Sequence, residues 1–260
     1  MSAWHDIHGD GPAVVLVHAG IADSRMWEPQ LHSFSDSHTV VRLDLPGFGN
    51  SPIETNPVSY RGAVADALDA AGVERAAIVG TSLGGMVALD FALDSPERAS
   101  ALVLVGAGTD DHEYSAEMQA FDAAEEAALE RGDLEAAVNA NLEFWLAGPR
   151  RTLDDVDPKV SELVAEMQRR AFAQSEGHDD LRALRLDPPA SQRLDEVRVP
   201  TLVVTGDEDV NDILVMGDRL ARDIPGAERA TIAGAAHLPN LEQPERFDQI
   251  VLGFLDRHGV

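Results

Sequence analysis

Cysteine is absent from the 260-residue sequence, and lysine occurs once, at Lys159. Without cysteine the chain forms no disulfide, has no thiol nucleophile and offers no cysteine-based metal site. No run approaches the roughly 20 apolar residues that a membrane-spanning helix needs. The first residues show neither the basic region nor the long apolar region of a secretory signal. We therefore expect a cytoplasmic protein that does not enter a membrane.

Basic residues are scarce overall. The chain has 46 acidic and 20 basic residues, which gives a formal net charge of −26. Such a surface repels nucleic acid and anionic membranes, so neither is expected as a partner. It also repels itself, and salt screens that repulsion, so adaptation to a salt-rich cytoplasm and a plain acidic surface both explain the composition. With 44% hydrophobic residues, the chain is long enough for one large domain with a sizeable core.

Short apolar runs alternate with helical segments along the chain. The runs lack polar alternation, which is typical of strands buried on both faces of a parallel sheet. This order predicts an α/β fold with a mostly parallel central sheet and helices on both faces. The predicted strands are 13–17, 39–43, 76–79, 101–105, 201–205 and 229–233, with an edge strand at 4–8. Helices are predicted at 57–71 and 244–257, among others.

The character of the sequence changes between residues 112 and 194. Strand-like runs are missing there, and segments rich in Ala, Glu, Met and Leu predict helices at 115–131, 134–146 and 158–174. We expect a core domain made of residues 1–111 and 195–260, with a helical cap of residues 112–194 inserted in it.

One turn within the predicted sheet carries a reactive group. The apolar run 76–79 leads into Gly80-Thr81-Ser82-Leu83-Gly84 and then into a helical pattern. Glycines on both sides allow strand and helix to approach closely, so that Ser82 projects at the end of the strand in a strained conformation. The turn lacks the G-x-G-x-x-G and Gly-Lys-Ser/Thr patterns of phosphate-binding loops. The sequence therefore predicts a serine nucleophile here.

Other polar residues follow other predicted strands. Strand 201–205 is followed by Asp207, Glu208 and Asp209, and strand 229–233 is followed by His237. Ligand sites of parallel sheets form beyond the carboxyl ends of the strands. A serine, an acid and a histidine in this chain order match the order that accompanies a G-x-S-x-G turn. A neutral imidazole can take the proton from the serine hydroxyl, and a carboxylate can orient that imidazole.

At this point the sequence resembles the α/β-hydrolase fold family over essentially its whole length. The motifs that carry the resemblance are GTSLGG at 80–85, VVTGDEDV at 203–210, GAAHLPNLEQPERF at 234–247 and DLPGFGNS at 44–51. The resemblance implies that Ser82 is the nucleophile, His237 the general base and Asp209 the orienting acid. It implies no cofactor, and we expect no metal.

Several neighbouring residues are weaker candidates. The competing acids are Asp207, Glu208 and Asp212, with Asp110 and Asp111 more remote; all five are interpreted as solvated loop acids. His18 is interpreted as structural. Four further histidines have no partner pattern and are expected at the surface: His5, His8, His112 and His178.

The attacked carbonyl oxygen needs hydrogen-bond donors already in place. The backbone N–H of Leu83 is expected to be one donor. The family usually has His-Gly-x in the loop after the first buried strand, whereas this chain reads His18-Ala19-Gly20. The resemblance places the second donor at the N–H of Gly20, with Ile21 as the alternative. The expected pocket-lining residues are Ile21, Trp27, Met86, Trp145 and Leu238.

A serine in the turn argues against family members that use an aspartate there. The leading hypothesis is a carboxylesterase or lactone hydrolase that cleaves a small ester, thioester or lactone through an acyl-enzyme. Alternatives on the same triad are a meta-cleavage-type carbon–carbon bond hydrolase and a cofactor-free haloperoxidase (perhydrolase). A ligand-binding receptor on the same fold is the non-enzyme alternative. The sequence does not fix the oligomeric state.

Overall fold

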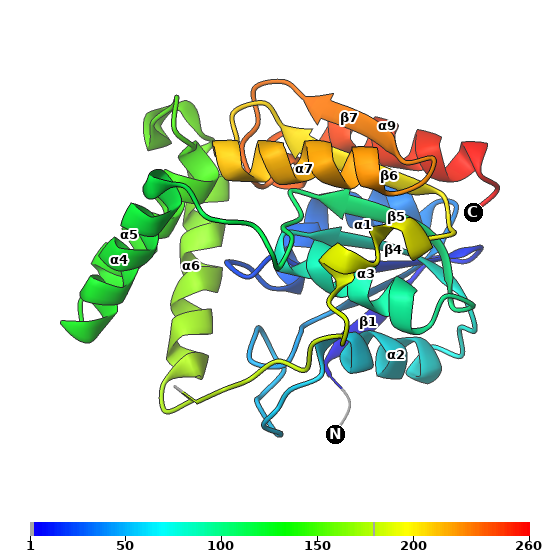
Figure 1. Ribbon diagram of the computed structural model, residues 1–260, viewed down its shortest axis with the longest axis horizontal. Coiled ribbons are helices and arrows are strands. Elements are labelled where there is room, and N and C mark those ends of the chain that lie inside the picture. The colour runs from blue at the N-terminus through cyan, green and yellow to red at the C-terminus, as the bar shows by residue number, and fades with distance from the viewer. Residues whose placement is uncertain (1–2, 179) are drawn as a thin grey trace.

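A seven-stranded sheet forms the centre of the computed structural model, which describes residues 3–178 and 180–260 (Figure 1). Its order is β1-β3-β2-β4-β5-β6-β7. β1 runs antiparallel to β3, and the other neighbouring pairs are parallel. The strands are β1 (His5–His8), β2 (Ala13–Val17), β3 (Thr39–Leu43), β4 (Ala76–Thr81), β5 (Ala99–Val105), β6 (Thr201–Gly206) and β7 (Glu228–Ile232).

The predicted strands are all present, and their ends differ from the predicted ones by at most two residues. β4 is buried along its whole length, and β2 is buried from Val14 onward. Strands covered on both faces need apolar side chains at every position, which is why uninterrupted apolar runs identified them. The predicted α/β fold class with a mostly parallel sheet is confirmed.

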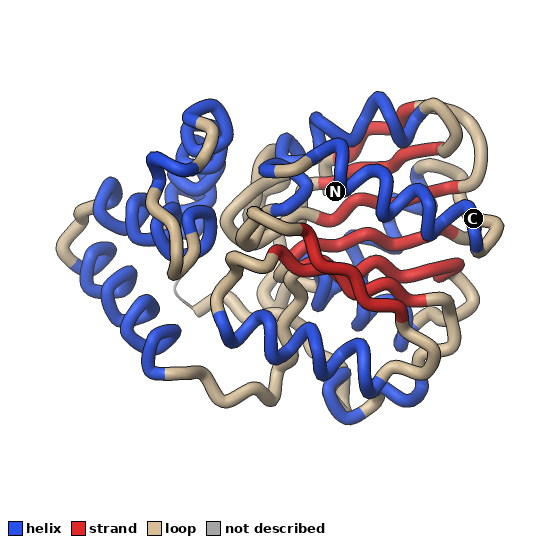
Figure 2. The backbone as a smooth tube through the Cα atoms, turned by 90° about the horizontal axis from the view of Figure 1, so that it is seen from above, coloured by secondary structure: helices blue, strands red, loops and turns tan. Residues whose placement is uncertain are grey.

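Helices cover both faces of the sheet (Figure 2). α1 (Glu28–Ser35) and α9 (Pro244–Arg257) share one hydrophobic cluster, whereas α2 (Tyr60–Ala70), α3 (Leu83–Asp94) and α7 (Asn211–Asp223) share another. In β2, Val14 and Leu16 belong to the first cluster, while Val15 and Val17 belong to the second. Successive strand side chains point to opposite faces, so one strand supplies both cores.

The segment after β5 forms a separate group of helices to one side of the sheet (Figures 1 and 2). These helices are α4 (Ala116–Glu130), α5 (Leu134–Asn141) and α6 (Pro158–Ser175). Lys159 lies exposed in the first turn of α6. After α6 the chain returns along the core, where the N–H of Leu184 donates to the carbonyl of Val58 at 2.8 Å.

The second of these helices differs from the prediction of one α-helix over 134–146. α5 ends at Asn141, and a π-helix, Leu142–Ala147, continues it to Gly148, which has a φ of 76°. The backbone N–H of His237 donates to the carbonyl of Trp145 within this π-helix, at 3.2 Å. The composition of the π-helix is that of an α-helix, and its i→i+5 hydrogen bonding distinguishes it, as in the bond from the N–H of Gly148 to the carbonyl of Glu143 at 3.1 Å.

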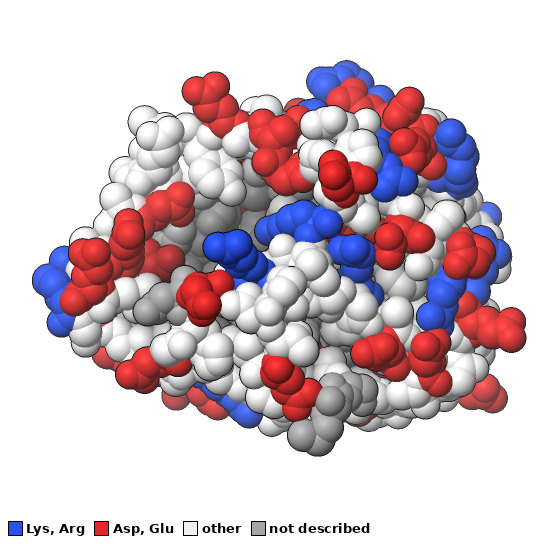
Figure 3. Space-filling model, turned by 60° about the horizontal axis from the view of Figure 1, so that its bottom comes forward, with Lys and Arg blue, Asp and Glu red and all other residues white. Residues whose placement is uncertain are grey.

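Acidic and basic side chains are scattered among uncharged residues on the face of the molecule shown in Figure 3. Many arginines of the described chain form ion pairs, such as Arg169 with Glu135 and Arg219 with Asp111. Within the parts of the chain that are described, no helix is long and apolar enough to cross a membrane.

Candidate active site

The turn between β4 and α3 holds Ser82 in an unusual backbone conformation. Ser82 has φ 54° and ψ −114°, and among residues 3–178 and 180–260 no other non-glycine residue has a positive φ. A Cβ on Gly80 would lie 2.1 Å from the carbonyl oxygen of Gly84, and a Cβ on Gly84 would lie 2.2 Å from that of Val17. Both glycines are therefore required by the close approach of strand and helix.

Ser82 is also the N-cap residue of α3, and its side chain makes no capping hydrogen bond. The first N–H groups of a helix have no acceptor within the helix and carry partial positive charge. A Cβ built on Gly20 would lie 3.6 Å from the Cβ of Leu83, so the loop after β2 reaches the start of α3. Backbone from two loops thus meets beside Ser82.

His237 and Asp209 form a buried pair at the ends of β7 and β6. The distance from His237 Nδ1 to Asp209 Oδ2 is 2.9 Å, and only 2% and 1% of the two side chains are exposed. Asp209 Oδ1 accepts a further hydrogen bond from the N–H of Val210 at 2.8 Å. A carboxylate on Nδ1 favours the tautomer with its proton there, which leaves Nε2 as an acceptor.

The backbone around this pair is as crowded as that around Ser82. A Cβ on Gly206 would lie 2.0 Å from the carbonyl oxygen of Ala235, and Gly106 has a φ of 51° with His237 next to it. The ends of β5, β6 and β7 therefore converge on one imidazole ring.

The competing acids have other partners. Asp207 accepts from the N–H of Gly234 at 2.7 Å, and Glu208 pairs with Arg150 at 2.8 Å. Asp111 pairs with Arg219. Within the described residues, none of the five competing acids forms a hydrogen bond or ion pair with His237, whereas Asp209 does.

The interpretation of Asp212 and His112 as solvated surface residues is wrong. Asp212 is 3% exposed, and its carboxylate accepts hydrogen bonds from the N–H and hydroxyl of Ser115, at 2.9 and 2.6 Å. Its other partner is His112 Nε2, at 2.8 Å. Burial acts to raise the pKa of Asp212, but these hydrogen bonds outweigh it and the pKa is lowered. Asp212 thus attaches the start of α4 to α7, a contact between distant segments.

His18 connects two loops and is fully buried. Its Nδ1 lies 2.8 Å from the carbonyl oxygen of Ala19, and its Nε2 lies 2.9 Å from the backbone nitrogen of Leu45. Burial lowers the pKa of His18. A neutral ring that donates from Nδ1 and accepts at Nε2 satisfies both contacts, so His18 holds the loop that carries Gly20.

The motif at 44–51 has a similar structural role. Asp44 is fully buried and accepts from the backbone N–H groups of Ser24 and Asn50, at 2.8 and 2.7 Å. Gly49 has a φ of 52°, and a Cβ there would lie 2.2 Å from Asp44 Oδ2. The motif therefore joins the loops after β2 and β3.

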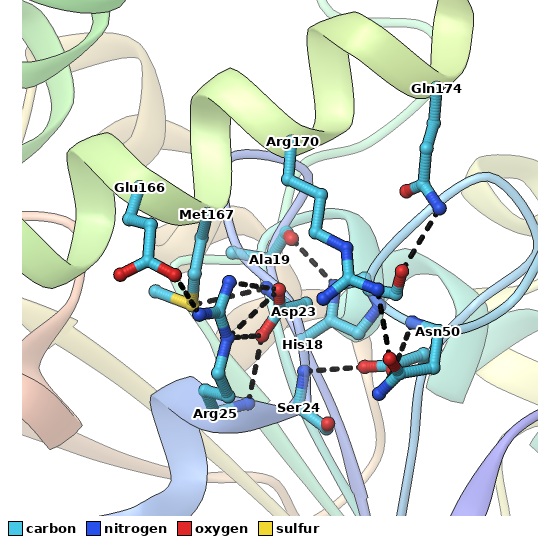
Figure 4. Close-up of polar contacts among 12 residues, drawn as sticks. His18, Ala19, Asp23, Ser24, Arg25, Asn50, Glu166, Met167, Arg170 and Gln174 are labelled. Atoms are coloured by element: carbon cyan, nitrogen blue, oxygen red, sulfur yellow. Dashed lines mark hydrogen bonds and ion pairs between the residues drawn. The ribbon is translucent and has the colours of Figure 1, made fainter.

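Helix α6 reaches these same loops (Figure 4). Arg170 donates to Asn50 Oδ1 at 2.8 Å, and the amide of Gln174 donates to the carbonyl of Gly49 at 2.9 Å. Glu166 pairs with Arg25 at 2.5 Å. The helix is thus held beside the loops that position Gly20 and Ser82.

A cavity of about 390 Å³ lies between the helices α4 to α6 and the carboxyl ends of the strands. Ser82, His237 and Gly20 line it on the sheet side, with Phe48 and Tyr60. The residues that line it from the helical side are Phe121, Glu125, Asn141, Trp145, Gln168, Ala171, Phe172 and Ser175. The Trp145 ring centroid is 4.4 Å from that of His237. The cavity thus brings the predicted nucleophile and base together under the helices.

Comparison with known proteins settles the family. The sequence profile of the alpha/beta hydrolase fold family matches residues 12–244. The chain belongs to the α/β-hydrolase family. This α/β-hydrolase is 27% identical to carboxylesterase YbfK of Bacillus subtilis (strain 168) over 264 residues, which cover 95% of this chain and 81% of that protein. It is 31% identical to the putative carbamate hydrolase RutD of Variovorax paradoxus (strain S110) over 273 residues, with coverage of 99% and 97%.

A solved structure described as Est816, an N-acyl homoserine lactone degrading enzyme, is also similar to this α/β-hydrolase. Its TM-score is 0.76 at 26% identity, and the alignment covers 96% of each chain. These three relatives are named for ester, carbamate and lactone chemistry, all of which breaks a bond at an acyl carbon. The family and its relatives identify the chain as an α/β-hydrolase enzyme.

The five expected pocket-lining residues of this α/β-hydrolase lie in three places. Ile21 and Trp145 line the cavity. Trp27 and Leu238 are fully buried in the core, where Trp27 packs against Phe247 with ring centroids 6.0 Å apart. Met86 lines a separate small pocket beside Gly108.

Sequence reasoning missed the polar lining from the helices, namely Glu125, Asn141 and Gln168. One signal was available for Gln168, because it follows Val164 and Ala165 on the buried side of α6. A glutamine on an otherwise apolar helix face is a polar group that needs a partner.

Proposed function

We propose that this α/β-hydrolase is a serine hydrolase that cleaves a small ester, thioester or lactone through an acyl-enzyme on Ser82. The observation that carries the proposal is the arrangement at the sheet edge. The Asp209 carboxylate accepts a hydrogen bond from His237 Nδ1, and His237 and Ser82 line one cavity. A serine, histidine and carboxylate so arranged are the requirements for nucleophilic acyl transfer.

In this mechanism Ser82 Oγ attacks the acyl carbon while His237 Nε2 takes the hydroxyl proton. Asp209 holds the ring orientation and stabilises the imidazolium that forms. The tetrahedral intermediate then collapses, the proton on His237 passes to the leaving oxygen or sulfur, and an ester to Ser82 remains. Water, deprotonated by His237, attacks this ester, and the acid product leaves with Ser82 restored.

The oxyanion of each tetrahedral intermediate lies, in this proposal, between the N–H groups of Leu83 and Gly20. Support comes from the position of Leu83 at the start of α3 and from the close approach of Gly20 to it. Donors fixed before the reaction stabilise the developing charge without reorganisation.

We assign residues 112–194 as a cap over the site. The cap covers the cavity with aromatic rings, which include Phe121, Trp145 and Phe172. Keeping bulk water out of the cavity strengthens the electrostatic contacts at Ser82, while a single water molecule is enough for the hydrolysis step. A cavity of about 390 Å³ suits a small-molecule substrate.

Release of p-nitrophenol from p-nitrophenyl acetate tests the proposal. Wild-type protein should give a burst that matches the enzyme concentration and should react with a fluorophosphonate probe. Ser82→Ala should lose both the burst and the label, whereas Ser37→Ala, at an exposed position, should retain both. A burst of wild-type size from Ser82→Ala would refute the assignment of Ser82.

A further inference from the structure

Three polar side chains from three helices of the cap line the cavity that contains Ser82. They are Glu125 on α4, Asn141 on α5 and Gln168 on α6, called here the cap cluster. Asn141 is 2% exposed, and its Nδ2 donates to Glu125 Oε1 and, at 3.0 Å, to the carbonyl oxygen of Ala137. The amide of Asn141 is therefore used within the protein, and it orients the carboxylate of Glu125.

Gln168 differs because its side-chain oxygen has no partner. The residue is 4% exposed, and no described residue donates to its Oε1, which is buried. Leaving a buried acceptor without a hydrogen bond costs about 1–3 kcal/mol, and among the buried side-chain atoms without a partner this oxygen belongs to a residue that lines the cavity with Ser82. A half-turn of the Gln168 amide would present this oxygen to the cavity, where a donor on a bound molecule would supply the missing hydrogen bond.

The charge of the cavity wall indicates which donor fits. Neither lysine nor arginine occurs among the described residues that line the cavity, and Glu125 is its one acidic residue. Burial raises the pKa of the Glu125 carboxyl, and the hydrogen bond from Asn141 opposes that rise. Phe121 and Phe172 add aromatic rings to the same wall, and aromatic faces attract cations. A positively charged group with several N–H donors complements this wall, whereas a carboxylate does not.

We propose that the cap cluster is a specificity site for a protonated amine on the substrate, remote from the bond that Ser82 attacks. In this arrangement the ammonium donates to Glu125 and to Gln168 Oε1. The inference rests on the proposed function, since it names the class of ester, thioester or lactone that the site prefers. It assigns the choice of substrate to the cap and the bond cleavage to the sheet edge.

Three p-nitrophenyl esters with the same chain length test the preference. The 6-aminohexanoate, the heptanoate and the pimelate half-ester end in an ammonium, a methyl and a carboxylate group. We expect kcat/KM to be highest for the aminohexanoate and lowest for the pimelate half-ester. An equal or higher kcat/KM for the heptanoate would overturn the proposal.

Matched variants locate the effect. Glu125→Gln keeps the shape and removes the charge, so the ratio of kcat/KM for aminohexanoate over heptanoate should fall about tenfold, as expected for a hydrogen bond to a charged group. Glu126→Gln makes the same change at the exposed neighbour and should leave the ratio at the wild-type value. Gln168→Leu should also lower the ratio. A wild-type ratio in both Glu125→Gln and Gln168→Leu would show that the cap cluster is purely structural.

Binding without turnover separates this inference from the proposed function. n-Pentylammonium should bind the Ser82→Ala protein and change its tryptophan fluorescence through Trp145, more strongly than 1-pentanol or pentanoate. Adding Glu125→Gln should remove that advantage. If the wild-type protein cleaved no ester yet bound pentylammonium in this way, the proposed function would fail and the amine site would stand. Equal binding of the three ligands would overturn the amine site, whatever the protein hydrolyses.

Discussion

The two walls of the cavity are built differently. On the sheet side, Ser82 is held by glycines that nearly touch other backbone, and the His237–Asp209 pair is almost fully buried. On the cap side, several contacts with the core are ion pairs at the surface, such as Arg25 with Glu166, whose carboxylate side chain is 65% exposed. Exposed pairs of this kind contribute little stability.

In the proposed function this difference separates two tasks. Bond cleavage requires groups fixed to within fractions of an ångström, and crowded backbone supplies that fixation. Substrate selection tolerates a wall that adjusts, and the exposed pairs allow more adjustment than the two buried contacts between cap and core, Asp212 with Ser115 and Arg151 with Glu242. The π-helix Leu142–Ala147 is the place where the two walls meet, because Trp145 contacts His237 through both its backbone and its ring.

The largest effect is expected from the sheet side. In Asp209→Asn the partner of His237 Nδ1 changes from a carboxylate to an amide, so the tautomer needed for catalysis is no longer favoured. We expect kcat/KM for p-nitrophenyl acetate to fall by roughly 10³- to 10⁴-fold. The matched control is Asp207→Asn. Asp207 lies nearby but accepts its hydrogen bond from the N–H of Gly234, so this variant should keep most of the activity. A comparable loss of kcat/KM in Asp207→Asn would contradict the assignment of Asp209 as the acid that orients His237.

A smaller effect, on stability, is expected at the turn. Gly80→Ala places a Cβ 2.1 Å from the carbonyl oxygen of Gly84, so the strand or the helix must shift. The expected loss in the free energy of unfolding is about 3 kcal/mol, measured by urea denaturation. Gly253→Ala, within α9 and without backbone in the way, should instead stabilise by about 0.5–1 kcal/mol. Similar values for the two variants would mean that the turn is not crowded.

A contact between cap and core should show a pH-dependent effect. Arg151 pairs with Glu242 at 2.6 Å, and Glu242 in turn accepts from the N–H of Ala236, next to His237. Burial raises the pKa of the Glu242 carboxyl, and the Arg151 pair opposes that rise. Arg151→Met removes the positive charge that lowers the pKa of Glu242, so this pKa rises further. The folded state then binds the proton of the Glu242 carboxyl more tightly than the unfolded state does.

The sign of the pH effect follows from that shift. Below the ordinary pKa of glutamate the carboxyl is protonated in both states, and the variant should lose only the hydrogen bonds that Arg151 donates to the carbonyl oxygens of Leu146, Ala147 and Gly234, a loss that does not vary with pH. As the pH rises, the buried charge goes unpaired, and the loss in the free energy of unfolding should grow to about 2 kcal/mol by pH 8. Urea denaturation at about pH 3.5 and at pH 8 measures the difference. Arg169→Met, which removes an exposed pair with Glu135, should show no such pH dependence.

Much of the fold could be predicted because its causes are local. An uninterrupted apolar run such as Ala13–Val17 is typical of a strand covered on both faces. Gly80 and Gly84 permit the tight turn at Ser82 because a side chain at either position would meet backbone. An acid after β6 and His237 after β7 could be placed together because the carboxyl ends of parallel strands share one edge of the sheet, whereas the choice of Asp209, 28 positions before His237, came from the family resemblance.

The remaining features depend on contacts between distant segments. The carbonyl of Trp145, within the π-helix, accepts a hydrogen bond from His237, 92 positions along the chain. Asp212 is buried because Ser115 and His112 meet it from the start of the cap. Which cap residues face the cavity depends on the rotation of each helix about its axis, so Trp27 and Met86 looked as suitable as Trp145.

The single lysine provides a site for selective chemical labelling. Lys159 is exposed at the beginning of α6, the helix that also carries Gln168. Apart from an α-amino group, an amine-reactive dye therefore has one attachment point on the whole chain, and that point is on the cap. With no cysteine to compete, a fluorophore there would record movements of α6 without any engineered residue.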